Sequence, residues 1–277
     1  DALSGVLDIQ GINYNYGQYD PYHKAHPSQP IISSESCSCT TDRGEYSGDN
    51  ATTGHVSAYS SCVWSCWQPV AARKFIIGSM DWTGFDYKGE PTPYNWPDVN
   101  SHFGVNDIAG FPKDDYWYYR AWWQQGNETI IHIVPDDWNQ WTTGQKVSVW
   151  IYTNAYYIDL QLNGKSVSNG MQQVETQSAL QLSVIYASGI LTAIGYDINK
   201  NIIGNHSIET TNKAYSIELI AEYPGNTIYS DGQDVSLIQV RIVDNMGRRV
   251  PNANNMISFS IKGDGIIYGV GNGDPAC

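Results

Sequence analysis

Three short apolar segments, each ending in polar or aromatic residues, constrain the fold of this chain most strongly. They run from Val6 to Tyr14, from Pro30 to Glu35 and from Lys74 to Trp82. Strands that are buried on both faces read as continuous apolar runs, as in the parallel core of a (β/α)8 barrel. Barrel enzymes carry their chemistry at the carboxyl ends of these strands. The pattern therefore predicts a parallel sheet whose carboxyl edge carries Asn13, Tyr14, Glu35, Asp81 and Trp82.

The segment 56–73 fits the helix that must connect two parallel strands. Apolar and aromatic residues recur there at near-helical spacing, at Tyr59, Val63, Trp64 and Trp67. Pro69 should end or kink this helix. Three strands cannot close a barrel, so we expect the five earlier strands to precede Asp1.

After about Trp123 the pattern changes to short alternating segments that predict β-strands. These segments are 129–134, 146–153, 157–162, 179–184 and 189–196. Asn163-Gly164 directly follows the third segment and is a strong hairpin signal. Short strands separated by regular turns indicate an antiparallel sandwich.

A second region of predicted strands begins at Tyr215. Its strands are expected at 216–221, 236–244 and 255–262, which is too few for a complete sandwich. We therefore predict three domains. Residues 1–124 would be the C-terminal part of a (β/α)8 TIM barrel, 125–213 an antiparallel β-sandwich, and 214–277 a second sandwich that is truncated.

Charge and aromatic content narrow the classes of partner. A net charge of -13 would repel a phosphate backbone and an anionic membrane surface. No apolar run approaches the roughly 20 residues of a membrane span. Trp (10) and Tyr (20) greatly outnumber Phe (5). Because Trp and Tyr combine an apolar face with a hydrogen-bonding edge, they suit sugar rings. A Tyr-rich extracellular β-domain explains the same composition.

Cysteine spacing and glycosylation sequons bear on the compartment. Cys37, Cys39, Cys62 and Cys66 are spaced unlike the paired cysteines of common zinc sites, so one or two disulfides or buried thiols are favoured over a metal. The sequons begin at Asn50, Asn127 and Asn205. We expect a secreted or lysosomal-type protein that needs no cofactor.

Glu35 is the candidate nucleophile of a retaining glycosidase. Such enzymes use two carboxyl groups about 5 to 5.5 Å apart, one to attack the anomeric carbon and one to protonate the leaving oxygen. An apolar strand ending in Pro30-Ile-Ile-Ser-Ser-Glu35 delivers one carboxylate to the rim of a barrel. A glutamate at the end of a strand is also often structural, so the assignment depends on its neighbours.

A series of motifs closely resembles glycoside hydrolase family 2, in its β-galactosidase branch. The motifs are Gly11-Ile-Asn-Tyr14, Pro30-Ile-Ile-Ser-Ser-Glu35, Arg43-Gly-Glu-Tyr46, Asp81-Trp-Thr-Gly-Phe-Asp-Tyr-Lys-Gly-Glu-Pro-Thr-Pro-Tyr94, Trp96-Pro97 and Gly110-Phe-Pro-Lys-Asp114. Segments 150–165 and 231–275 resemble the immunoglobulin-like modules that follow the barrel in this family.

The resemblance implies roles for individual residues. Glu35 would be the nucleophile, Tyr14 would orient its carboxylate, and Trp82 would form one wall of the sugar pocket. Asp81, Asp86 and Asn13 would be candidate sugar contacts, whereas the alternative is that each braces a loop or turn. For His23 a structural role is favoured. The implied ligand is an oligosaccharide that contains a β-galactoside.

The sequence departs from the full family pattern in one important respect. The family acid/base is the glutamate of an Asn-Glu pair, and the Asn127-Glu128 pair lies in the predicted linker between barrel and sandwich. We therefore expect the isolated 277-residue chain to be inactive. Two alternatives remain open: a β-glucuronidase of the same family, against which stands the lack of an Asn-x-Lys motif between Trp82 and Asp115, and a non-catalytic carbohydrate-binding or scaffold protein.

Overall fold

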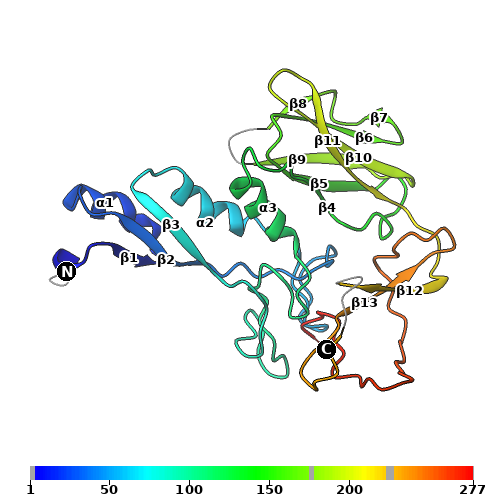
Figure 1. The fold of residues 1–277 in the computed structure, drawn as a ribbon. Helices are drawn as coiled ribbons and strands as arrows, with labels where there is room; N and C mark the ends of the chain where they lie inside the picture. Colours follow the sequence, from blue (N-terminus) through cyan, green and yellow to red (C-terminus); the bar gives the residue numbers. More distant parts are fainter. Residues whose placement is uncertain (1–3, 175–177, 223–227, 277) are drawn as a thin grey trace.

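The first part of the chain is built around a three-stranded parallel sheet (Figure 1). The computed structural model describes residues 4–174, 178–222 and 228–276. The sheet has the order β1-β2-β3, with β1 at Gln10–Asn13, β2 at Ile31–Cys37 and β3 at Ile76–Trp82. All three predicted parallel strands are confirmed. The first begins later than predicted because residues 5–9 are exposed and Ser4–Val6 forms a short 3-10 turn, η1.

Helices connect the parallel strands, as the sequence pattern predicts. The 3-10 turn η2 at Tyr16–Gln18 and helix α1 at Tyr19–Ala25 join β1 to β2, and helix α2 at Cys62–Ala71 joins β2 to β3. Val63, Cys66 and Val70 are the buried residues of α2, at spacings that keep them on one face. The helix is shorter than the predicted 56–73 and ends two residues beyond Pro69. Gln68 still accepts a backbone bond from Ala72, at 3.0 Å.

A third helix, α3 at Asp114–Trp123, was not predicted and joins the two halves of the molecule. It packs with α2 against strand β5 at Lys146–Thr153. The rings of Tyr118 and Tyr152 meet edge to face with their centres 5.5 Å apart, and a hydrogen bond of 2.7 Å joins His132 Nε2 to Asp114 Oδ1. An aromatic contact and a buried hydrogen bond therefore fix the β-sheet region against the parallel sheet.

Two antiparallel sheets form the middle of the chain. One sheet has the order β4-β5-β9 and the other β11-β10-β6-β7, with β8 also paired to β6. The remaining bounds are β4 Ile131–Val134, β6 Tyr157–Leu162, β7 Lys165–Ser166, β8 Gln172–Gln173, β9 Ala179–Ile185, β10 Ile190–Tyr196 and β11 Ile202–Glu209. Ile151, Leu160 and Leu191 are fully buried in the core between the sheets. The five predicted strands are confirmed; β7, β8 and β11 are additional.

The turn between β6 and β7 is the hairpin that Asn163-Gly164 predicts. Leu162 pairs with Lys165, and both turn residues have positive φ, 52° at Asn163 and 75° at Gly164. Two consecutive left-handed residues match the right-handed twist of the flanking strands, and Asn and Gly adopt that conformation at the lowest steric cost.

The last part of the chain contains one antiparallel pair, β12 at Ser216–Ala221 and β13 at Ile238–Val243. The strand predicted at 255–262 is wrong, since the structure assigns no strand to those described residues. Most of that stretch is exposed, with Met256 at 94%, so its alternating pattern has no sheet face to bury. Among the described residues, no helix is long and apolar enough to span a membrane.

The described C-terminal end returns to the loops of the first part (Figure 1). Asn100 Nδ2 donates to the carbonyl of Pro275 at 2.6 Å, and His55 Nε2 lies 3.0 Å from Asp274 Oδ1. The C-terminal segment therefore braces the loops that follow β2 and β3.

Candidate active site

The carboxyl ends of β1, β2 and β3 bring the predicted site residues to one edge of the sheet. The amide of Tyr14 donates to the carbonyl of Glu35 at 2.9 Å, and the amide of Ser38 donates to the carbonyl of Trp82 at 3.0 Å. Asn13 pairs with Glu35 across the two strands and is exposed. Backbone bonds at the strand ends therefore fix Tyr14, Glu35 and Trp82 relative to one another.

Tyr14 supplies a hydroxyl to the Glu35 carboxylate. Its side chain hydrogen-bonds Glu35 and also contacts the hydroxyl of Ser38. Burial, with a further contribution from the charge of Glu35, raises the pKa of Tyr14 to about 12, although the Ser38 bond lowers it. The phenol is therefore protonated at neutral pH and can donate to an ionised carboxylate.

The backbone around Glu35 is held in an uncommon conformation. Tyr14, Cys37 and Ser38 have φ values of 53°, 72° and 51°, in the left-handed region that L-residues rarely occupy. Such residues persist only where surrounding contacts enforce them, and they concentrate at functional sites. Here the contacts include a bond of 3.0 Å from the Cys37 amide to the Tyr16 hydroxyl.

Trp82 stands on the exposed side of this edge, with 38% of its surface accessible. Its Nε1 donates to the Tyr87 hydroxyl at 3.1 Å, and Tyr87 in turn donates to the Glu90 carboxylate. The rings of Trp82 and Tyr87 meet edge to face with their centres 6.0 Å apart. The loop after β3 therefore orients the indole ring.

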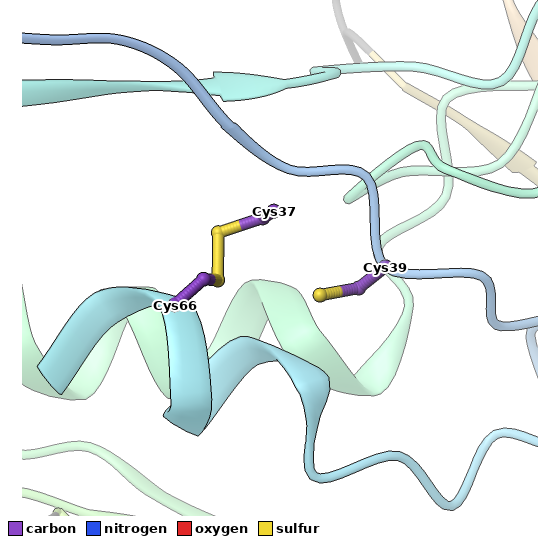
Figure 2. Close-up of side chains that lie close together, drawn as sticks. All are labelled: Cys37, Cys39 and Cys66. Carbon is purple, nitrogen blue, oxygen red and sulfur yellow. A yellow bond between two sulfur atoms is a disulfide. The ribbon is translucent and has the colours of Figure 1, made fainter. Parts of the chain in front are cut away.

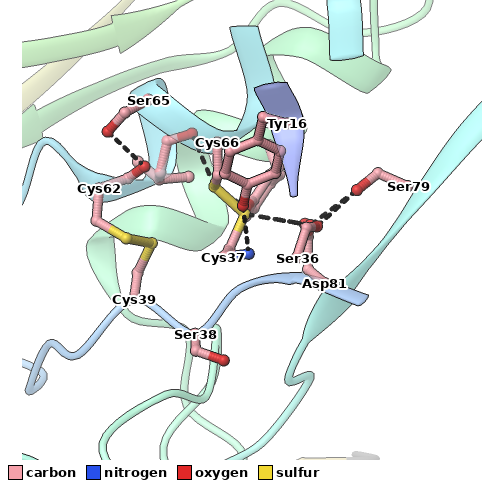
Figure 3. Close-up of a disulfide and its surroundings, with 12 residues drawn as sticks. Tyr16, Ser36, Cys37, Ser38, Cys39, Cys62, Ser65, Cys66, Ser79 and Asp81 are labelled. Atoms are coloured by element: carbon pink, nitrogen blue, oxygen red, sulfur yellow. Dashed lines mark hydrogen bonds between the residues drawn. A yellow bond between two sulfur atoms is a disulfide. The ribbon is translucent and has the colours of Figure 1, made fainter. Parts of the chain in front are cut away.

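Asp81 points to the opposite side of the sheet, towards the helices (Figure 3). Its Oδ1 accepts from the Ser36 hydroxyl at 2.7 Å and from the Ser79 hydroxyl at 3.3 Å. It also hydrogen-bonds Tyr119 of α3, and burial raises its pKa. These contacts support a bracing role for Asp81 rather than contact with a sugar.

Asp86 is also engaged by the protein. It forms a buried ion pair of 2.7 Å with Lys113 Nζ, and its Oδ1 accepts from the Gly104 amide at 2.7 Å. These contacts support the alternative that Asp86 braces a loop, with Lys113 and the Gly104 amide as its partners. His23 stacks on Phe75 with 3.8 Å between ring centres, which supports its structural role.

Two disulfides follow Glu35 in the sequence. Cys37 is bonded to Cys66 (Figures 2 and 3) and Cys39 to Cys62 (Figure 3), so the segment after the candidate nucleophile is attached twice to α2. This pairing decides between the disulfides and the buried thiols that the sequence left open. Sulfurs of Cys37, Cys39 and Cys66 are near enough to ligate one ion, but as disulfides they offer no thiolate.

A small void separates the disulfides from α3. Its volume is about 10 Å³, which is about the space of one water molecule. Asp115 lines it and is buried, and its Oδ1 has no hydrogen-bond partner among the described residues. Burial, reinforced by the charge of Asp114, raises the pKa of Asp115 to about 8.

Four residues at this edge were missed in the sequence: Tyr16, Ser38, Tyr87 and Glu90. Ser38 lies between Cys37 and Cys39, which the sequence marks only as candidates for disulfides. Tyr87 and Glu90 belong to the long motif after β3, so their position in that motif was the available signal. Their contacts depend on the path of the loop, which no local pattern specifies.

Comparison with known proteins identifies the family of this chain. It is 33% identical to β-galactosidase BoGH2A of Bacteroides ovatus over 98% of its length. A family model described as "Glycoside hydrolase family 2 C-terminal domain 5" matches residues 219–277, and the domain of unknown function DUF4982 matches 144–203. The chain belongs to glycoside hydrolase family 2.

Other relatives carry different names. A β-glucuronidase of Formosa agariphila is 26% identical over 73% of the chain. A solved structure of a family 2 member from Bacteroides cellulosilyticus superposes with a TM-score of 0.70 and 26% identity over 89% of the chain. The chain spans only part of each: 34% of BoGH2A, 20% of the glucuronidase and 33% of the solved chain.

Proposed function

We propose that the protein carrying this chain is a retaining glycoside hydrolase that removes terminal β-D-galactosyl units, with Glu35 as its nucleophile. The observation that carries the proposal is the position of Glu35 at the carboxyl end of β2, beside the Tyr14 hydroxyl. The 33% identity to a β-galactosidase over nearly the whole chain supports the choice of sugar.

The proposed reaction has two steps. A carboxylate oxygen of Glu35 forms an ester bond to the anomeric carbon, while the glycosidic bond breaks and the leaving oxygen takes a proton from the acid/base. Water then attacks the same anomeric carbon and gives its proton to the acid/base, while the bond to Glu35 breaks; the carboxylate is restored and the sugar leaves with retained configuration. Tyr14 orients the Glu35 carboxylate, and Trp82 packs its apolar face against the sugar.

The proposal assigns the acid/base to a part of the protein outside this chain, which spans about a third of BoGH2A. It also interprets residues 1–124 as the C-terminal part of a TIM barrel, and 125–213 and 214–277 as immunoglobulin-like modules. The parallel order β1-β2-β3 and the two packed antiparallel sheets support this division. Asn13 is retained as a candidate sugar contact, since its side chain is exposed beside Glu35.

A β-glucuronidase is the second candidate, because curated relatives carry that name. Glucuronidases of the family tend to bind the sugar carboxylate through an Asn-x-Lys motif after the eighth barrel strand. None occurs between Trp82 and Asp115, and Asn163-Gly-Lys165 is committed to the β6–β7 hairpin. These features favour a neutral sugar.

We further propose export to an oxidising compartment. Disulfides persist outside the cytosol, and this chain carries two of them next to its candidate site. The natural ligand would be a galactoside-containing oligosaccharide of a secreted or extracellular glycan.

The test uses the full-length protein and its Glu35→Gln variant. The wild type should hydrolyse an aryl β-galactoside in preference to the matching β-glucuronide. The variant should lose on the order of a thousandfold or more in turnover, because Gln keeps the shape but removes the attacking charge. Azide should restore some turnover and give the inverted glycosyl azide.

Three outcomes would contradict the proposal. Normal hydrolysis by Glu35→Gln would remove Glu35 as nucleophile. Preferential cleavage of glucuronides would reverse the choice of sugar. Activity of the isolated 277-residue chain would show that no outside acid/base is needed. A matched control, Glu128→Gln on the surface after α3, should retain wild-type turnover.

A further inference from the structure

The loop that follows β3 encloses a second, open hollow beside the candidate active site. About 600 Å³ of space lies within it, and it is widely open to solvent. Lys88, Pro91, Asn95, Trp96, Asp98 and Val99 line it. Trp96 has 83% of its surface accessible, although it is among the largest apolar side chains.

Hydrogen bonds hold this loop in one conformation. The amide of Gly89 donates to Val99 at 2.5 Å, that of Asp98 to Asn95 at 3.0 Å, and that of Ser101 to Tyr87 at 2.7 Å. The hollow is therefore preformed, and a ligand would bind without ordering a loop.

Contacts from outside the loop add to this rigidity. The Tyr94 hydroxyl donates to the His55 carbonyl at 2.5 Å, and Asn100 is held by Pro275. The middle and the C-terminal side of the loop are thereby attached to other segments, while Trp96 faces solvent.

The chemistry of the lining suits a neutral sugar unit. The indole of Trp96 offers an apolar face for the C–H surface of a pyranose ring. One cation, one amide and one carboxylate surround the indole, at Lys88, Asn95 and Asp98. These groups can hydrogen-bond sugar hydroxyl groups, and their opposite charges do not favour a charged ligand. In the described part of the chain, the side chains of Lys88 and Asn95 have no hydrogen-bond partner, so their polar groups are open to a ligand.

The same loop connects this hollow to the site at Glu35. Tyr87 accepts from Trp82 and donates to Glu90, while Lys88 and Gly89, which lie between Tyr87 and Glu90, line the hollow. A glycan whose terminal unit lies against Trp82 would continue past this loop.

We propose that the hollow is a subsite for a neutral sugar unit on the leaving-group side of an oligosaccharide substrate, with Trp96 as its stacking platform. This inference rests on the proposed glycosidase function.

The experiment compares a short and a long substrate on full-length wild type and on Trp96→Ala. For a β-linked galactotriose, the variant should lose at least about fivefold in kcat/KM, through a higher KM, because a stacking contact of this kind is worth about 1 kcal/mol. For an aryl β-galactoside, whose leaving group is too short to reach the hollow, kcat/KM should stay within about twofold. Trp96→Tyr should recover most of the loss.

Controls separate this inference from the function on which it rests. Tyr215→Ala removes an exposed aromatic residue just before β12 and should change neither substrate. If wild type cleaves both substrates and Trp96→Ala cleaves both equally well, the subsite is refuted while the glycosidase proposal stands. If Trp96→Ala impairs both substrates equally, Trp96 belongs to the terminal-sugar pocket and the subsite is again refuted. If wild type cleaves neither, the proposed function itself fails. Binding of the triose by Glu35→Gln, weakened by adding Trp96→Ala, then tests the hollow separately.

Discussion

Removing the disulfides behind Glu35 should loosen the segment between Thr40 and Ala71 by an amount that the loop lengths predict. Cys37–Cys66 spans a sequence separation of 29 residues, and Cys39–Cys62 spans 23. In the chain-entropy description, closing either loop alone is worth about 3.5 kcal/mol of stability. The second loop lies inside the first, so the two contributions are not independent.

Once one disulfide is formed, the other closes only the small ring made by residues 37–39 and 62–66. That second closure adds about 2.5 kcal/mol. Replacing one pair by alanine should therefore lower the free energy of opening by about 2.5 kcal/mol, whichever pair is chosen. Replacing both pairs should lower it by about 6 kcal/mol, which exceeds the sum of the two single effects by about 1 kcal/mol.

Hydrogen exchange followed by mass spectrometry measures this opening in the full-length protein. Peptides that cover α2 report the affected segment, and peptides from β10 serve as the internal control because they pack in a separate core. Alanine is the appropriate replacement because Cys39 and Cys66 are buried. Strictly additive losses, or a double replacement no worse than a single one, would refute the nested-loop reasoning.

Two further predictions concern single residues near the site. Trp82→Ala should weaken galactoside binding by at least about tenfold with little change in Tm, because the exposed ring lines a pocket. Ligand titration and thermal unfolding measure the two effects, and a large drop in Tm at unchanged affinity would contradict the prediction. Asp115 has its pKa raised to about 8 by burial, so the stability that its protonated form contributes is complete below about pH 4 and is lost as the pH rises towards 8. Asp115→Asn should remove this loss, so denaturant titrations at pH 5 and pH 8 should show a smaller decline than in wild type; equal declines would place the ionisation elsewhere.

Local patterning predicted the strands well wherever a sheet face is buried. Strands β5 and β6 begin and end at the predicted residues, because burial on the core side imposes alternation on their sequence. The same alternation at 255–262 failed, since a pattern of period two does not create a partner strand. Helix α3 was not predicted because its own aromatic residues lie on several of its faces, so the sequence shows no helical period.

The limits of the site prediction have a geometric cause. The strand pattern brought Glu35, Asp81 and Trp82 to one edge but did not reveal which face each side chain takes. Alternation would settle the face if the strands paired regularly, yet the pairing of β2 with β3 shifts between Ser33 and Ser36. Between these two pairs β2 has one residue more than β3, and Glu35 lies in this irregular stretch. Ser36 therefore pairs with Asp81 on the side of the sheet that faces the helices. There the hydroxyl groups of Ser36, Ser79 and Tyr119 hydrogen-bond the Asp81 carboxylate. The chain therefore separates two carboxylates that are adjacent in the prediction: Glu35 stays beside Tyr14, and Asp81 supports the strand from behind.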